Sequence, residues 1–308
     1  MRLKNFVEFK NVSEGGKAIK SARPIRQDEA MKTIENIKEV LLPLLDLDSY
    51  KEGKDYIFIG STGKKKNPED TSGDIDLGFN GNYFATKHGI SFKECSKTLM
   101  DMLSPELPKV LGFEPEMNNL SGLNILSVAW PIAGDANNGF VQLDLMPLQN
   151  MEWAKFIYYS PDYRTDESQW KSAHRNWLLS AALVARREIL ANDEQGEVLD
   201  YRTPALILPS GLYLQTKSFR GKLKPRLKNA QKIPGTEEFI TDDPQEFINY
   251  ALGPGYSEND VKTFEKVLSI MTSPNFKYKE FLPQIKEKFI QLLNRTDLPV
   301  PPETEKLG

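Results

Sequence analysis

The chain has 308 residues, with 40 Lys and Arg, 43 Asp and Glu and a formal net charge of −3, so its length allows one large domain or two of ordinary size. Hydrophobic residues make up 39% and charged residues 27%, which is typical of a protein that folds around an apolar core. Because Cys95 is the single cysteine, an intrachain disulfide and a thiolate zinc site are both excluded.

The N-terminal residues mix charged and apolar side chains and lack the continuous apolar run of a signal peptide or a membrane span. This pattern and the cysteine usage predict a cytoplasmic protein without a membrane partner. Gly15 and Gly16 lie among polar and basic residues, so we expect residues 1–25 to form an arm. Apolar residues at helical spacing then predict a helix from about residue 28 to 45.

The apolar run from Tyr56 to Ile59 predicts a short central strand that ends at Gly60 and Ser61. Glycine has no Cβ, so the backbone at Gly60 can approach a phosphate closely, and the Ser61 hydroxyl can donate a hydrogen bond to it. We therefore interpret Gly60 and Ser61 as nucleotide-binding residues.

A second strand is predicted from residue 74 to 79, with Asp74 and Asp76 on one face because side chains alternate along a strand. Their Cα atoms should lie about 6.6 Å apart, so both carboxylates can converge on one hard cation or on two neighbouring cations. Ile75 and Leu77 should face the core. The apolar strand from residue 139 to 147 carries a third carboxylate, Asp144.

The insert between the strand at 56–59 and the strand at 74–79 contains Lys64, Lys65 and Lys66. A solvated loop and a loop that contacts substrate are equally open interpretations. Beyond it, the pattern predicts a turn at 80–83, a helix starting at the capping box of Ser91 and Glu94, and strands near 112–117 and 123–132. A turn at 134–139 should place Asp144 in a hairpin beside the Asp74 strand.

These elements predict an α+β fold with a small mixed sheet and packed helices over residues 26–150. Gly60-Ser61, the spacer, Asp74-x-Asp76 and the strand of Asp144 resemble the nucleotidyltransferase superfamily related to DNA polymerase beta, over roughly residues 55–147. Residues 153–162 have a looser similarity to bacteriophage-type nucleotidyltransferases, which implies the host cytoplasm as the location.

The resemblance implies transfer of a nucleoside monophosphate from a nucleoside triphosphate to an acceptor hydroxyl, with release of pyrophosphate. It implies that Asp74, Asp76 and Asp144 are catalytic and hold two Mg²⁺ or Mn²⁺ ions. In that mechanism Gly60 and Ser61 hold the β and γ phosphates.

From residue 151 the sequence becomes aromatic and helical, which predicts a mainly helical domain over 151–297 and a flexible tail over 298–308. We expect a long helix at about 167–190 and further helices near 244–251, 258–271 and 281–293. No acidic residue lies between Asp200 and Glu237, and basic residues accumulate over 217–232.

Alternating basic and apolar residues predict a short β element with a basic face over 217–232, and a solvated surface ribbon is the alternative interpretation. From this segment we predict three nucleotide-binding residues, Lys217, Lys222 and Lys224. The basic segment favours an RNA or DNA end as acceptor. A small-molecule or protein acceptor, or an inactive fold used as a binding module, stay open as alternatives, and the sequence predicts no oligomeric state.

Overall fold

The computed structural model describes residues 18–45, 51–195, 206–208, 210–216, 236–296 and 298–308. The chain forms two compact units, Met1–Gln169 and Trp170–Gly308, and its mixed architecture confirms the predicted α+β class. The division falls after the expected boundary at residue 150. The reason is that α6 (Met151–Ile157) packs Ala154 against strand residues of the first unit.

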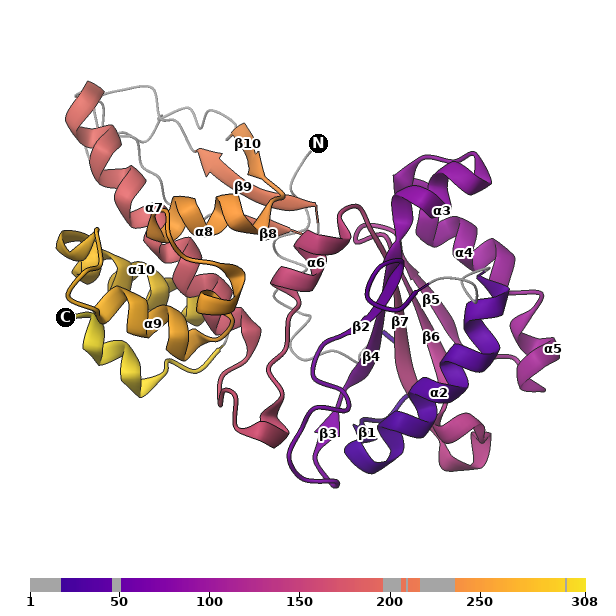
Figure 1. Ribbon diagram of the computed structural model, residues 1–308. Coiled ribbons are helices and arrows are strands. Elements are labelled where there is room, and N and C mark those ends of the chain that lie inside the picture. Colours follow the sequence, from indigo (N-terminus) through magenta and orange to yellow (C-terminus); the bar gives the residue numbers. More distant parts are fainter. Residues whose placement is uncertain (1–17, 46–50, 196–205, 209, 217–235, 297) are drawn as a thin grey trace, which may run out of the picture. The chain divides into compact units, whose positions relative to one another are not determined.

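A five-stranded mixed sheet lies at the centre of the first unit (Figure 1). The β4 strand is parallel to β7, and every other pairing in the sheet is antiparallel. The hairpin of β6 and β7 lies beside β4, as predicted. In spatial order the strands are β2 (Tyr56–Ile59), β4 (Asp74–Asn80), β7 (Phe140–Leu148), β6 (Ile125–Pro131) and β5 (Met117–Leu120).

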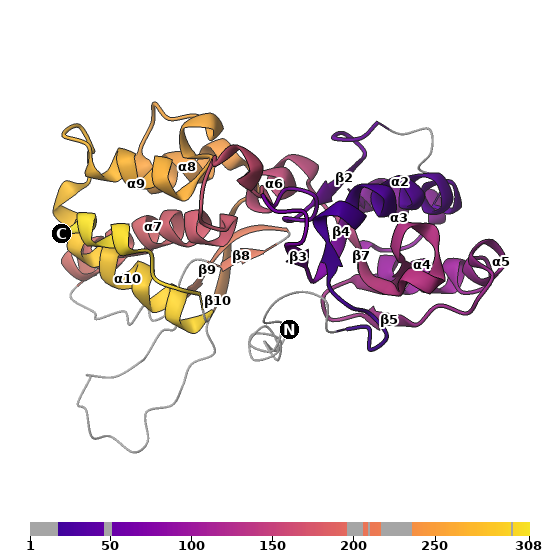
Figure 2. The ribbon, with the colours of Figure 1, turned by 90° about the horizontal axis from the view of Figure 1, so that it is seen from below.

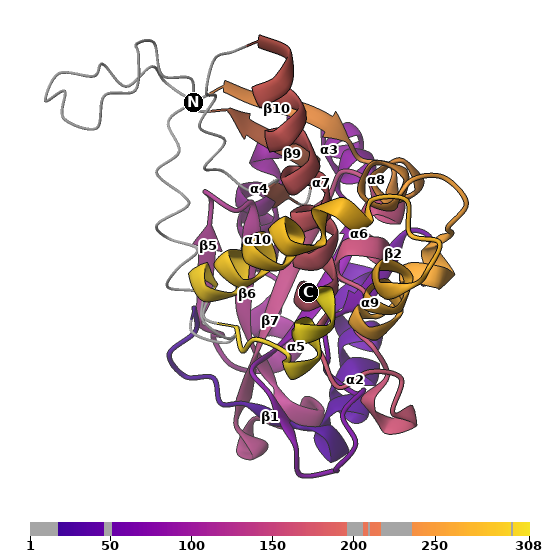
Figure 3. The same ribbon diagram turned by 90° about the vertical axis from the view of Figure 1, so that its left-hand side faces the viewer.

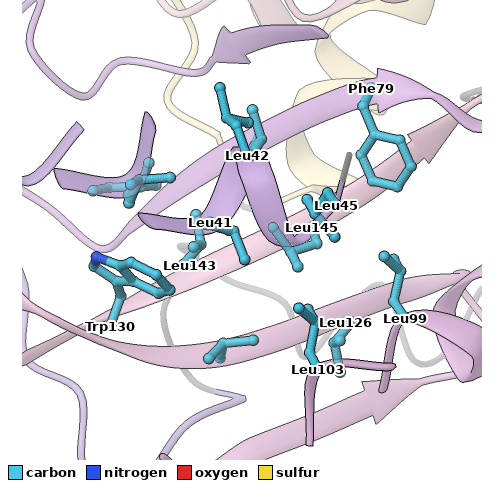
Figure 4. Close-up of a cluster of buried hydrophobic side chains, with 14 of the residues drawn as sticks. Leu41, Leu42, Leu45, Phe79, Leu99, Leu103, Leu126, Trp130, Leu143 and Leu145 are labelled. Carbon is cyan, nitrogen blue, oxygen red and sulfur yellow. The ribbon is translucent and has the colours of Figure 1, made fainter. Parts of the chain in front are cut away.

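One face of the sheet forms the main hydrophobic core with α2 (Gln27–Leu44) and α4 (Cys95–Leu103). Figure 4 shows Leu41 of α2 beside Leu143, and Leu99 and Leu103 of α4 on the side of the cluster where Leu126 lies. Ile75 and Leu77 belong to this core, which confirms their predicted orientation.

The opposite face of the sheet is apolar in one part and acidic in another. Ile57, Ile59, Met146 and Leu148 form a second cluster with Ala154 of α6. Figure 1 shows α6 on the side of the sheet away from α2 and α4. Since side chains alternate along each strand, this same face also carries the aspartates of β4 and β7.

Two local predictions in this unit are wrong. The turn expected at 80–83 is the start of α3 (Gly81–His88), where the Asn80 side chain accepts a hydrogen bond from the Tyr83 N–H at 2.9 Å. Asparagine favours both turns and helix starts, so the sequence signal was ambiguous. The strand expected near 112–117 begins only at Met117, because Gly112, at φ 76°, ends α5 (Leu107–Leu111). The capping box of Ser91 and Glu94 is confirmed.

The start of α2 is joined to the insert that follows Ser61. The backbone N–H of Gln27 donates to the Asp70 carbonyl at 3.0 Å. Its side chain donates to the Ser72 hydroxyl at 3.2 Å and accepts from the Lys65 N–H at 3.2 Å. Nearby, β1 (Ile25–Arg26) pairs with β3 (Thr71–Ser72), so both ends of the insert are attached to one helix start.

The second unit is organised around a long helix, α7 (Ser172–Gln195). Figure 2 shows α7 between the pair α8 and α9 and the helix α10. The predicted helices are present as α8 (Pro244–Leu252), α9 (Phe264–Thr272) and α10 (Leu282–Arg295). Figure 3 shows β9 and β10 of a small antiparallel sheet, whose strands are β8 (Leu206–Leu208), β9 (Gly211–Thr216) and β10 (Thr236–Thr241).

The C-terminal residues are packed against this unit, so the predicted flexible tail over 298–308 is wrong. Residues Pro302–Leu307 form a 3-10 helix with Thr304 and Leu307 buried, and Lys286 contacts the Glu305 carboxylate at 2.8 Å. Burial of the Leu307 side chain stabilises an end that its prolines alone would leave extended. Across the described parts of the chain, we find no helix with the length and apolarity that a membrane span requires.

We expect Leu41→Ala to lower the free energy of unfolding of the first unit by about 2–5 kcal/mol, because Leu41 is fully buried in the main core. Urea denaturation measures this change. Met31 lies on the same helix and is 52% exposed, so Met31→Ala is the matched control, with an expected change within about 0.5 kcal/mol. Equal effects of the two substitutions would contradict the proposed packing of α2.

Candidate metal and nucleotide site

The candidate site begins where β2 ends. Gly60 has a φ of 79°, a conformation that residues with a Cβ rarely adopt. A Cβ at this position would lie 2.9 Å from Oδ2 of Asp76. Position 60 therefore needs glycine for two reasons, its backbone conformation and the close approach of Asp76.

The residues after Gly60 turn back toward β4. The Ser61 carbonyl accepts a hydrogen bond from the Lys64 N–H at 3.1 Å, and the Ser61 side chain is half-buried. The Thr62 hydroxyl donates to the Asp74 carbonyl at 2.7 Å. Thr62 thus attaches the turn to the first residue of β4, a role that sequence reasoning missed because a threonine in a polar insert carries no distinctive signal.

The parallel pairing of β4 and β7 brings the three aspartates together. Asp76 lies opposite Asp144 in the register, and Asp74 lies opposite Gln142. Each aspartate offers one carboxylate oxygen such that all three oxygens lie within 4.8 Å of one another. Carboxylate oxygens at this spacing can surround a divalent cation.

Burial and mutual repulsion disfavour the charged forms of these aspartates. The pKa of Asp76 is held well above its ordinary value, first by burial and then by the carboxylates of Asp74 and Asp144. Burial, with repulsion from Asp144, raises the pKa of Asp74 to about 6, against an opposing effect of Lys65.

Asp144 differs from the other two aspartates because it receives hydrogen bonds from its neighbours. The Ser127 hydroxyl donates to Oδ1 at 2.6 Å, and the Gln142 side-chain N–H group donates to Oδ1 and Oδ2 at 3.0 and 3.1 Å. Burial raises the pKa of Asp144, and the bonds from Ser127 and Gln142 oppose that rise. Neither Ser127 nor Gln142 was singled out from the sequence, although both lie on the face that strand alternation assigns to Asp144.

The three lysines of the insert have different surroundings. Lys65 acts electrostatically on Asp74, and its ammonium also contacts the Thr71 carbonyl. Lys64 donates to the Ser160 carbonyl at 3.3 Å, and Lys66 pairs with Asp166 at 3.0 Å on the surface. Lys65 is therefore a lysine of the insert whose charge acts on the acidic cluster.

Tyr158, at the end of α6, also lies beside the acidic cluster. Its pKa is raised by burial and by the negative charge of Asp76. Tyr158 packs against the apolar cluster of Ile57, Met146 and Leu148, so it marks the border between the apolar and the acidic parts of this face. The sequence showed only an aromatic helix here, and aromatic residues at helical spacing are usually packing residues.

Lys217, Lys222 and Lys224 fall outside the described residues, as does the whole segment 217–232. Their assignment as nucleotide-binding residues stays a prediction. Among the described residues, Lys65 supplies positive charge near Asp74, and the sequence analysis had treated it only as part of a lysine run.

The donor set suits a hard cation. Mg²⁺ and Mn²⁺ prefer oxygen ligands, and the cluster offers carboxylates without an imidazole or thiolate. A cation held by Asp74, Asp76 and Asp144 would also offset the repulsion that raises the pKa values of Asp74 and Asp76.

Comparison of the chain with family models, with curated proteins and with solved structures finds no match. Function is therefore inferred from the side chains at this face of the sheet and from their arrangement.

We expect Asp76→Asn to raise the free energy of unfolding in EDTA at pH 8, by about 1.4 kcal/mol for each unit by which the folded pKa of Asp76 exceeds the unfolded one. The raised pKa means that folded Asp76 keeps its proton to a higher pH than unfolded Asp76. Between the unfolded and the folded pKa, the unfolded carboxyl is ionised while the folded one is protonated, so stability falls as pH rises from about 4 and levels off above the folded pKa. The gain from Asp76→Asn should therefore shrink toward about pH 4. Thermal unfolding across this pH range measures the effect.

Asp101→Asn is the control, because Asp101 is an exposed carboxylate that pairs with Lys97 on α4. We expect Asp101→Asn to bring no such gain at pH 8. A pH dependence of stability that is the same in Asp76→Asn and in the original chain would contradict the mutual repulsion of the three aspartates.

Proposed function

We propose that this chain is a metal-dependent nucleotidyltransferase that transfers a nucleoside monophosphate from a nucleoside triphosphate to an acceptor hydroxyl. The observation that supports this most is the acidic cluster itself: three carboxylates on adjacent parallel strands, beside a glycine that approaches Asp76 closely. The resemblance of Gly60-Ser61, Asp74-x-Asp76 and Asp144 to the polymerase beta superfamily points to the same chemistry.

In this proposal Asp74, Asp76 and Asp144 hold Mg²⁺ or Mn²⁺, in a site for two ions. When bound, such ions supply positive charge against the phosphates and lower the pKa of a hydroxyl. Burial and the repulsion among the carboxylates both disfavour the charged forms of Asp74 and Asp76, and a bound cation would offset part of this cost. Ser127 and Gln142 favour the ionised form of Asp144 by donating hydrogen bonds to it.

The turn after β2 is the proposed phosphate-binding element. The absence of a side chain at Gly60 lets the backbone come close to the cluster, and Ser61 follows at once with a hydroxyl that can donate to a phosphate oxygen. Lys65 provides a positive charge near Asp74, where a triphosphate would need one. The predicted basic residues Lys217, Lys222 and Lys224 would add to this charge.

An RNA or DNA end is the proposed acceptor, on the strength of the basic segment 217–232. A small-molecule or protein acceptor and a binding module without catalysis are outcomes of the test. The chain is incubated with each α-labelled nucleoside triphosphate, with Mg²⁺ or Mn²⁺, and separately with RNA, DNA and protein pools. Label that enters RNA or DNA supports the proposal, label that enters only protein or a small molecule changes the acceptor, and triphosphate binding without transfer indicates a binding module.

We expect Asp76→Asn and Asp144→Asn each to reduce transfer by on the order of 10²-fold or more, as removal of one preorganised electrostatic group does in other active sites. Initial rates of label transfer measure the loss. Asp101→Asn, on the surface of α4, should keep the original rate. Full activity in either cluster variant would remove these carboxylates from the mechanism.

We expect Ser61→Ala to weaken triphosphate binding by about 1–3 kcal/mol, the usual effect of losing a hydrogen bond to a charged group. Calorimetric titration in the presence of Ca²⁺ gives the affinity without turnover. Ser104→Ala is a suitable control, since the Ser104 hydroxyl bonds only locally, to the Met100 carbonyl at 2.7 Å and to the Met117 sulfur at 3.9 Å. If the two variants bind triphosphate equally well, Ser61 has only a structural role in the turn.

A further inference from the structure

The side chain of Gln142 connects the acidic cluster to a distant part of the chain. Its Nε2 group donates to both carboxylate oxygens of Asp144, at 3.0 and 3.1 Å. On the other side, its Oε1 atom accepts from the backbone N–H groups of Ala18 and Ile19, at 2.8 and 3.1 Å. Gln142 is only 3% exposed, so few alternative partners are within reach.

These four hydrogen bonds determine which way the amide points. Two N–H donors can face only the oxygen of the amide, and a carboxylate can face only its nitrogen. The segment that contains Ala18 and Ile19 therefore holds the amide in the orientation that Asp144 needs. Without those two N–H groups, the amide could rotate and present its oxygen to the carboxylate.

The segment 18–23 is in turn attached to the sheet by contacts that do not involve Gln142. The Glu116 carboxylate accepts from the backbone N–H groups of Lys20 and Ser21 and from the Ser21 hydroxyl, at 2.9, 3.0 and 2.8 Å. The Arg23 N–H donates to the Phe140 carbonyl at 2.8 Å, and the Asn118 side chain donates to the Ala18 carbonyl at 3.1 Å. The docked position of this segment can thus be changed at Glu116 without touching Gln142 or Asp144.

We propose that Gln142 is a positioning residue for Asp144, and that docking of segment 18–21 and cation binding at the acidic cluster stabilise each other through it. This inference rests on the proposed cation site. Asp144 Oδ1 accepts from both Ser127 and Gln142, whereas Oδ2 accepts from Gln142 alone among the residues that the structure describes. Without Gln142, Ser127 is the one described residue that donates a hydrogen bond to this carboxylate. The carboxylate can then pivot about that single hydrogen bond.

The first test is the affinity of the full chain for Mn²⁺, measured by calorimetric titration. We expect Gln142→Met to weaken Mn²⁺ binding by about tenfold or more, since loss of a partner that orients a metal ligand typically costs 10–100-fold. Gln142→Glu is the second variant if the first does not fold, because it keeps an acceptor for Ala18 and Ile19 but presents no N–H to Asp144. Asn36→Ala is the matched control, since it removes a hydrogen bond with Trp130 from the other face of the sheet.

The second test separates positioning from a general loss of stability. Glu116→Ala should weaken Mn²⁺ binding by a few-fold in the original chain and should have no further effect in the Gln142→Met background, because the two residues act through one path. Linkage requires the reverse effect as well. Mg²⁺ should therefore slow amide hydrogen exchange at residues 18–21 in the original chain, and should not do so in Gln142→Met.

Several outcomes would overturn the inference. They are unchanged Mn²⁺ affinity in Gln142→Met and Gln142→Glu, an equal loss in Asn36→Ala, or additive effects of Glu116→Ala and Gln142→Met. An original chain that binds no Mn²⁺ overturns it too. A chain that binds Mn²⁺ with the expected coupling but transfers no nucleotide would contradict the proposed function alone, so the two failures are distinguishable.

Discussion

Electrostatic repulsion among three carboxylates that share one face of a sheet is the constraint on which the rest of the first unit depends. The register of β4 and β7 sets Asp76 directly opposite Asp144. Asp74 lies two residues before Asp76, on the same face of β4. A slip of one residue in either strand would turn its aspartates into the main core and its leucines toward the site. The fit of Ile75, Leu77 and Leu143 in that core therefore also keeps the carboxylates together.

The neighbours of the cluster each reduce the free-energy cost of holding these charges together. Ser127 and Gln142 donate hydrogen bonds to Asp144, and Lys65 opposes the rise of the Asp74 pKa. Within the described part of the chain, no residue gives Asp76 such a favourable contribution, and its pKa is held well above the ordinary value. Under the proposed function, Asp76 is thus the carboxylate whose ionisation would gain most from a bound cation.

Local patterns were sufficient to predict the strands of the site. Strand alternation predicted that Asp74 and Asp76 lie on one face of the strand. The turn over 134–139 predicted the hairpin that carries Asp144. The sequence could not show that β7 runs parallel to β4, because that pairing is set by tertiary packing. Gln142, Ser127 and Thr62 were missed for a related reason: their roles come from partners that are distant along the chain or opposite on another strand.

The errors outside the site have similar causes. Asn80 and Gly81 were assigned to a turn because the residues that favour turns also favour helix starts. The packed segment 298–308 was assigned to a tail because burial of Leu307 depends on elements of the second unit, which its own prolines do not reveal. Prediction from local preference fails where a distant contact decides between two acceptable conformations.

The attachment of Gln27 to both sides of the insert has a consequence for ligand binding. Gln27 contacts Lys65 and Ser72 with its side chain and Asp70 with its backbone, so the insert is ordered when α2 forms. A loop that becomes ordered only around its ligand loses conformational entropy at the moment of binding, and its affinity falls accordingly. Here the hydrogen bonds of Gln27 hold part of the insert in place without a ligand, so under the proposed function a triphosphate would bind with a smaller loss of conformational entropy.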